Sequence, residues 1–163
     1  QTVWNAAHGF APDHGIRDVD VVYFDPGDLS AGAEHAVEER LRRHLAAAGV
    51  AVRLDVTNEA RVHLWYEERF GVPLAPYRST CDAIATWPAT AGSVGVRPAD
   101  GDEADGAEGR GHGDGLVVCA PFGLDDLLGL VVRPNRVLVT EEVYAAKAAR
   151  WRAAWPRLRV LDW

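Results

Sequence analysis

The order of strand and helix patterns between residues 18 and 56 constrains the fold more than any other feature of this sequence. The segment 18–24 is rich in β-branched and aromatic residues, which predicts a strand. An apolar residue then recurs every four positions over 31–48, between Ser30 as a plausible N-cap and Gly49 at the C′ position. Apolar and other residues alternate over 50–56, which predicts a second strand.

The rest of the chain continues this mixed pattern. We predict helices at 59–70, 80–86, 123–129 and 141–155, strands at 93–97 and 116–120, and a loop over 5–17. In the last helix, Tyr144, Ala148, Trp151 and Trp155 form an apolar stripe that we expect in the core. This order predicts an α/β (α+β) fold, a small mixed β-sheet flanked by helices. The length of 163 residues fits one domain over 1–163.

Charge and composition exclude several classes of protein. The net charge is −7, and most of it comes from the glycine-rich segment 99–115, which has six acids and one arginine and which we predict to be a disordered loop. No basic stripe suits duplex DNA, and no apolar run reaches the ~20 residues of a membrane helix. We therefore expect no duplex DNA partner, no membrane partner and a cytoplasmic location.

The two cysteines, Cys81 and Cys119, have neither CxxC nor zinc spacing. Two reduced thiols are the favoured interpretation for a cytosolic protein, and a disulfide remains the alternative.

Asp18 and Asp20 are the sharpest candidates for chemistry. Residues i and i+2 of a strand point to the same face, with Cα atoms ~7 Å apart. Two carboxylates so placed repel each other unless a cation or a proton separates them. A hard cation such as Mg²⁺ binds one or two carboxylates together with substrate phosphates.

Asp55 alternates with the apolar residues of the second strand. If the two strands pair, Asp55 reaches the site of Asp18 and Asp20. Three carboxylates could then hold two metal ions ~3.5–4 Å apart, an arrangement suited to in-line phosphoryl or nucleotidyl transfer. The alternative is that all three are solvated acids at strand ends.

Several sequence blocks together cover nearly the whole chain: Trp4-Asn5, His8-Gly9, 12–21 (PDHGIRDVDV), 23–25 (YFD), Asn58, 60–67 (ARVHLWYE), 120–127 (APFGLDDL), 132–135 (VRPN) and 147–151 (KAARW). These blocks resemble a bacterial family of nucleotidyltransferases in the polymerase-β-like superfamily. The superfamily pattern is a Gly-Gly or Gly-Ser turn, a D-x-D or D-x-E pair on a strand, and a third carboxylate on a later strand. Asp18 and Asp20 match the pair and Asp55 matches the third position.

The resemblance also predicts where the glycine turn lies. Gly92-Ser93 follows the D-x-D pair and therefore does not match the turn. We expect the turn before residue 1, so that the glycine-turn segment is missing from this chain.

Three further residues are candidates for nucleotide binding. Arg61 falls in the first turn of a predicted helix, where the helix dipole disfavours a cation unless an anion such as a triphosphate lies nearby. The alternative is a salt bridge to Glu59, Asp55 or another acid. His14 lies in a loop four residues before Asp18, and His63 is the third candidate. A structural role is the alternative for both histidines.

The resemblance implies a metal-dependent nucleotidyltransferase that uses Mg²⁺ or Mn²⁺. Such an enzyme moves an NMP group from an NTP to an acceptor hydroxyl and releases pyrophosphate. The acceptor is unknown and is a small molecule, an RNA or a protein. Two alternatives stay open: a non-catalytic nucleotide-binding or interaction module of the same fold, and a metal-dependent phosphohydrolase.

Overall fold

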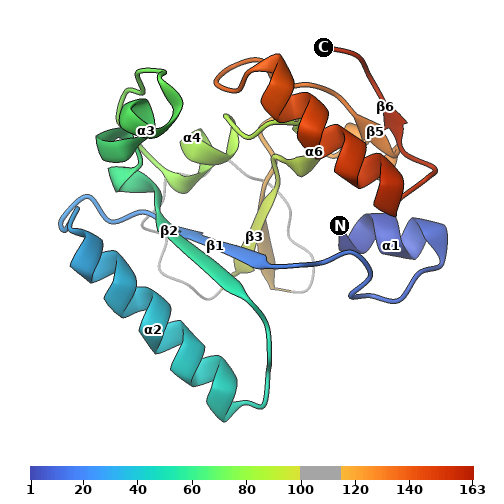
Figure 1. The fold of residues 1–163 in the computed structure, drawn as a ribbon. Helices are drawn as coiled ribbons and strands as arrows, with labels where there is room; N and C mark the ends of the chain where they lie inside the picture. The colour runs from blue at the N-terminus through green and yellow to red at the C-terminus, as the bar shows by residue number, and fades with distance from the viewer. Residues whose placement is uncertain (100–114) are drawn as a thin grey trace. The chain divides into compact units, whose positions relative to one another are not determined.

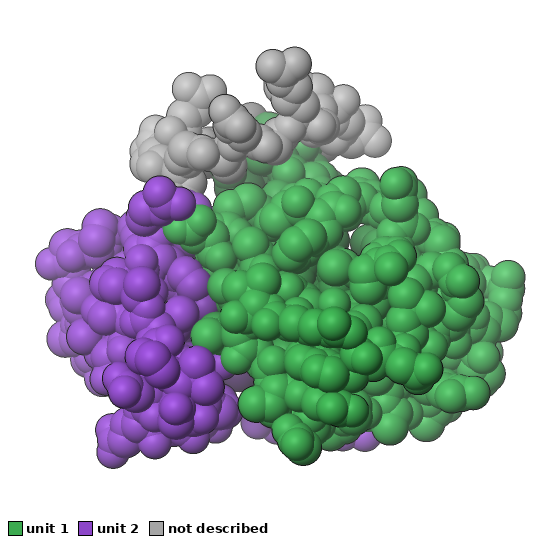
Figure 2. Space-filling model, turned by 90° about the horizontal axis from the view of Figure 1, so that it is seen from above, with its two compact units in different colours: residues 1–15, 81–163 green, residues 16–80 purple. Residues whose placement is uncertain are grey.

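The computed structural model describes residues 1–99 and 115–163. The predicted acidic loop at 99–115 lies almost wholly outside the described residues. The chain divides into two compact units, one formed by Gln1–Gly15 with Cys81–Trp163 and the other by Ile16–Thr80 (Figure 2). The predicted α/β class is confirmed. The strands of the described residues form three two-stranded sheets, two parallel and one antiparallel, and helices flank them.

The unit formed by residues 16–80 contains a strand–helix–strand crossover (Figure 1). Strands β1 and β2 pair in parallel, and helix α2 connects them and contacts β2. A 3₁₀ turn and a further helix follow β2 directly. The elements are β1 (Val19–Tyr23), α2 (Ala31–Ala47), β2 (Leu54–Asn58), η1 (Glu59–Arg61) and α3 (His63–Phe70).

Helix α2 has the boundaries that its capping residues predict. The Ser30 hydroxyl accepts a hydrogen bond from the Ala33 backbone N–H and so caps the first turn. Gly49 follows the last turn with a φ of 70°, in the left-handed region that glycine adopts without steric cost. The prediction of 31–48 is therefore confirmed to within one residue.

Strand β2 begins later than the alternation predicts. It covers Leu54–Asn58 rather than 50–56, and Val50 and Val52 are exposed. The parallel partner decides this boundary, because the ladder begins where Val19 pairs with Leu54. Before that point the Arg53 carbonyl accepts from the Val19 N–H at 2.9 Å, but residues 50–53 form no ladder pair with β1, so their alternating pattern alone does not make them a strand.

The other unit is built around a tryptophan-rich core. Its elements are α1 (Thr2–His8), η2 (Thr90–Gly92), β3 (Gly95–Pro98), β4 (Leu116–Cys119), α5 (Asp125–Leu128), β5 (Val131–Val132), α6 (Glu141–Ala154) and β6 (Arg159–Val160). Helix α4 (Thr80–Ile84) begins at its boundary. Trp4 packs edge-on against Trp151 and Trp155 at ring-centroid distances of 5.8 and 5.3 Å. The predicted apolar stripe of the last helix is therefore confirmed as core.

Helix α1 corrects the prediction of a loop over 5–17. Residues 5–8 are helical, and long-range contacts hold them. The Asn5 side chain donates to the carbonyls of Pro12 and His14, and its oxygen accepts from the Trp155 indole N–H at 2.6 Å. The glycines and prolines of the following segment favour a loop, so local sequence patterns do not predict this helix.

The cysteines also depart from the favoured interpretation. Cys81 and Cys119 form a disulfide with a Cα–Cα distance of 6.0 Å, within the usual range. The bridge joins the start of α4 to the end of β4, two elements that only the tertiary fold brings together. Among the described residues, none of the helices combines the length and apolar character needed to cross a membrane.

Candidate active site on the parallel strand pair

The register of β1 and β2 places two of the predicted acids side by side. Asp20 pairs with Asp55, and paired residues of neighbouring strands point to the same face. Both residues are exposed, whereas Leu54 and Val56, which point to the opposite face, are buried. Asp18 directly precedes β1, two residues before Asp20, so the alternation of the chain assigns it to the same face. The predicted pairing of the two strands is confirmed.

The side chains of these acids do not form a ready-made ligand cluster. No group of three or more His, Cys, Asp or Glu side chains in residues 1–99 and 115–163 is arranged to hold a metal ion. The backbone register is thus as expected, and the convergence of Asp18, Asp20 and Asp55 on one cation remains a prediction.

Glu59 is an acid of this region that the sequence patterns did not single out as a site residue. It follows β2 directly, in η1, and only 6% of its surface is exposed. Burial, with the charges of Glu34 and Asp20 adding to it, raises its pKa to about 7. No hydrogen bond or ion pair joins Glu59 to another described residue. Its position directly after a buried strand end is the only signal in the sequence.

Asn58 fixes the corner where β2 ends and η1 begins. It is fully buried, and its side-chain oxygen accepts from the backbone N–H groups of Asp25 and Ala60 at 3.0 and 3.1 Å. Its amide group donates to the carbonyls of Asp25 and Asp28 at 2.9 and 3.3 Å. One side chain therefore ties the segment after β1 to the end of β2, which is the edge of the sheet beside Glu59.

Arg61 makes a salt bridge within this same corner. Its Nη1 lies 2.7 Å from Glu34 Oε1, and its Nε donates to the Leu29 carbonyl at 3.1 Å. The other oxygen of Glu34 accepts from the Asn58 backbone N–H at 2.7 Å. The partner acid is thus Glu34 rather than Glu59 or Asp55. Because Glu34 compensates the charge of Arg61, this cation does little to stabilise the ionised form of the other acids of the unit.

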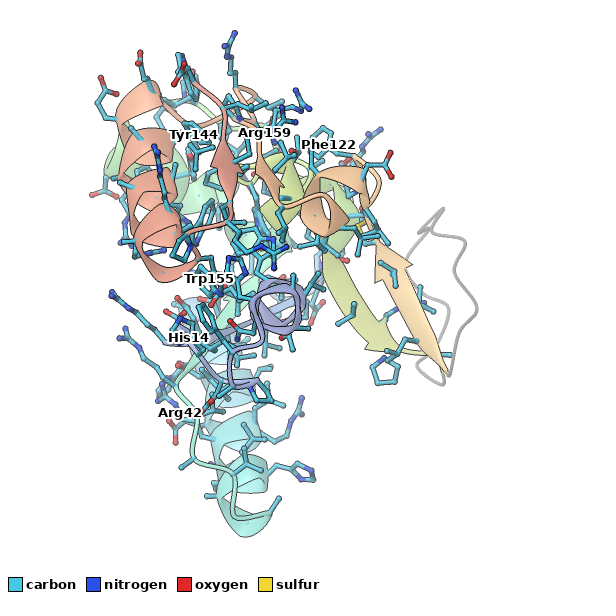
Figure 3. The ribbon with its side chains drawn as sticks, turned by 90° about the vertical axis from the view of Figure 1, so that its right-hand side faces the viewer. His14, Arg42, Phe122, Tyr144, Trp155 and Arg159 are labelled. Carbon is cyan, nitrogen blue, oxygen red and sulfur yellow. A yellow bond between two sulfur atoms is a disulfide. The ribbon has the colours of Figure 1, made fainter. Side chains whose placement is uncertain are left out.

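The two histidine candidates have different surroundings. His63 begins α3, and its Nδ1 is buried without a hydrogen-bond partner. His14 belongs to the tryptophan-rich unit, where Nε2 is 3.1 Å from the Ala154 carbonyl oxygen and the ring lies 4.3 Å from Phe10. Figure 3 labels His14 and Trp155, whose ring centroids are 6.0 Å apart. His14 therefore has structural contacts in its own unit.

The chemistry of the donors fits a hard divalent cation. Carboxylate oxygens are the ligands that Mg²⁺ and Mn²⁺ take, and Asp20 and Asp55 present theirs on an exposed face. Glu59 adds a buried carboxylate whose charge no described residue neutralises. Buried charges in proteins are normally paired or bound to a metal. The cation that lies in this corner, Arg61, is paired with Glu34 instead.

Comparisons with known proteins concern the family and the fold of the whole chain. A family model described as Nucleotidyltransferase matches residues 1–160. A protein whose NMR structure is described as revealing a CCA-adding enzyme head domain superimposes with a TM-score of 0.68 at 24% identity, and the match covers 99% of this chain and 76% of that chain. At this identity the likeness shows a shared fold. None of the curated proteins compared with the chain matches it. The family model spans almost the whole sequence, and the chain therefore belongs to the nucleotidyltransferase family.

Proposed function

We propose that this nucleotidyltransferase is metal-dependent and transfers an NMP group from an NTP to an acceptor hydroxyl. The observation that carries the proposal is the register of Asp20 with Asp55 on the exposed face of β1 and β2. Asp18 and Asp20 would each bind both metal ions, and Asp55 would bind one of them. Mg²⁺ or Mn²⁺ suits these oxygen donors.

In the proposed reaction, the acceptor oxygen attacks the α-phosphorus of the NTP. The new bond joins that oxygen to the α-phosphorus. The bond that breaks is the one between the α-phosphorus and the oxygen bridging it to the β-phosphorus, and pyrophosphate leaves. Asp55 receives the proton of the acceptor hydroxyl. Bound divalent cations lower the charge on the phosphoryl oxygens and stabilise the leaving group.

Arg61, His14 and His63 remain proposals for nucleotide binding. The salt bridge and the Leu29 contact use Nη1 and Nε of Arg61, and no hydrogen bond to a described residue uses Nη2. That nitrogen can donate to a phosphate oxygen while the Glu34 pair holds the guanidinium in place. For His63, the unpartnered Nδ1 supports a role in binding.

The decisive experiment incubates the protein with each labelled NTP, Mg²⁺ or Mn²⁺ and a cell extract. The result expected is a labelled product together with pyrophosphate. Removal of metal by EDTA should stop the reaction. Asp20→Asn should abolish it, whereas Asp125→Asn, an exposed acid of the other unit, should leave it unchanged.

Two results would contradict the proposal. Release of inorganic phosphate without labelled product would indicate a phosphohydrolase. Binding of NTP without turnover would indicate a nucleotide-binding module. Fractionation of the extract into small molecules, RNA and protein then identifies the class of acceptor.

A further inference from the structure

A groove runs along helix α6 in the tryptophan-rich unit, and the proposed function does not use it. One side of the groove is a face of α6, and the other is the C-terminal segment formed by β6 and the residues after it, which lies beside α6 (Figure 1). The groove has a volume of about 710 Å³. Three alanines of α6 that line it, Ala145, Ala149 and Ala153, are exposed, so the groove is open along the helix.

The two ends of the groove have opposite charges. Glu141 and Arg152 both line it, and they are eleven residues apart on α6, which is about three turns and ~16 Å along the helix axis. Asp162 adds a second acid at the first of these ends. It follows Leu161, whose carbonyl accepts from the Tyr144 hydroxyl at 2.6 Å, one turn along α6 from Glu141. Within the part of the chain that the structure describes, no hydrogen bond or ion pair engages the side chains of Glu141, Arg152 or Asp162.

The side of the groove opposite α6 has an aromatic wall. Trp163 lines the groove, and its ring lies 5.9 Å from the Tyr144 ring and 5.4 Å from the Arg136 guanidinium, measured to the ring centroid. Tryptophan is enriched among the residues that anchor protein interfaces. The alanines across from it have no bulk that would keep a second helix at a distance. A helix is therefore the shape that this groove fits, as in other complexes in which a helix lies in a groove.

The charge pattern of the groove is complementary to α6 itself. An α6 from a second copy of the chain, laid antiparallel in the groove, brings its own Arg152 to the acidic end and its own Glu141 to the basic end. A two-fold axis makes these two contacts equivalent, as the symmetry of a dimer requires. A parallel helix would instead bring like charges together at both ends.

We propose that this groove is a dimer interface, in which α6 of a second copy of this chain lies antiparallel to α6 and a Glu141–Arg152 pair closes each end. The inference is independent of the proposed function, because every residue that lines the groove belongs to the tryptophan-rich unit. The ion pairs mainly select the partner and its direction, since exposed pairs contribute little free energy. The apolar contacts of the alanines and Trp163 supply most of the attraction.

The test measures the dimer dissociation constant of the full chain by sedimentation over a wide range of concentrations. Arg152→Glu and Glu141→Arg each place like charges opposite one another at both ends, and each should weaken the dimer by about 10-fold or more. An equal mixture of these two variants should associate again, because every facing pair in the mixed dimer has opposite charges. Arg150→Glu changes an exposed arginine of α6 outside the groove, and it should dimerise as wild type does.

A second pair of variants tests the close approach of the helices without changing charge. Ala149→Gln puts a larger side chain into the groove and should weaken the dimer, whereas Ala146→Gln, at an exposed position of α6 outside the groove, should not. Unfolding curves of each variant show that the differences come from folded protein. A wild-type chain that stays monomeric at every concentration overturns the inference. So does a dimer that tolerates both charge variants, or a mixture of the two that stays as weak as each alone.

Discussion

Glu59 provides the sharpest test of the electrostatics of this fold, because its charge is buried and uncompensated in the metal-free protein. Its pKa rises from 4.5 to about 7 on folding. At about 1.4 kcal/mol for each pKa unit, the ionised side chain costs the folded state about 3 kcal/mol. The side chain is only 6% exposed, so screening by water does not reduce this value much. Glu59→Gln removes the charge and should remove the cost.

The sign of the pH dependence follows from the proton balance. Below pH 4.5 both the folded and the unfolded chain hold the Glu59 proton, so the carboxyl group costs nothing. Between pH 4.5 and about 7 only the folded chain holds it, and unfolding releases a proton. The free energy of unfolding of wild type therefore falls as the pH rises through this window, and above it the penalty is constant.

The assay is denaturant unfolding of wild type and Glu59→Gln between pH 4 and 8.5, in buffers with EDTA. The advantage of the variant over wild type should grow by about 3 kcal/mol across the window, about 6–12 °C in Tm for a chain of this length. Other titrating groups are common to both proteins and cancel in the difference. Glu68→Gln, an exposed control, should follow wild type at every pH. Parallel curves for wild type and Glu59→Gln would refute the assignment of a buried, uncompensated charge.

Three further predictions concern the metal site, the corner and the disulfide. Asp20→Asn should abolish the stabilisation of about 2.7 kcal/mol that Mg²⁺ with NTP at 100 times Kd gives wild type, and thermal melts with and without both ligands measure it. Its own stability without metal should equal or exceed that of wild type, because a like charge is removed. Asn58→Ala leaves one buried backbone group, the Ala60 N–H, and three part-buried ones without their side-chain partner, and should cost about 2–4 kcal/mol in urea unfolding, whereas a loss below 1 kcal/mol would show that the corner holds without the side chain. Reduction of Cys81–Cys119, which are 38 residues apart, should cost about 4 kcal/mol by the loop-entropy estimate, and equal Tm values with and without dithiothreitol would contradict it.

The elements that local patterns define well were predictable from the sequence. Strand β1 and helix α2 match their predictions because each has a clear period and its own end signals, such as the Ser30 cap and Gly49. The common face of Asp20 and Asp55 followed from the same alternation once the two strands were assumed to pair. Apart from the assumed pairing of the two strands, these inferences need only the geometry of one strand or one helix.

Glu59 was missed because its burial depends on how one short turn is built. The sequence predicts a single helix over 59–70, and in such a helix residue 59 is simply the first residue of an exposed turn. The structure instead has a 3₁₀ turn at Glu59–Arg61 and begins α3 at His63. A 3₁₀ turn advances 120° per residue rather than 100°, so side chains in it point in different directions from those of an α-helix. The Asn58 and Glu34 contacts that select this turn come from segments 24 to 33 residues away.

The parallel register also determines where this chain tolerates a change of length. The ladder starts at Leu54, so a residue inserted between Gly49 and Arg53 is absorbed before any strand pairing and leaves Asp55 opposite Asp20. A residue inserted between Asp55 and Asn58 instead moves each later side chain of β2 to the opposite face of the sheet, because side chains alternate at every step of a strand. It would separate the Asn58 corner and Glu59 from the strand face that they adjoin. The register of the five residues of β2 thus allows no insertion, whereas the loop that precedes β2 can change in length without shifting that register.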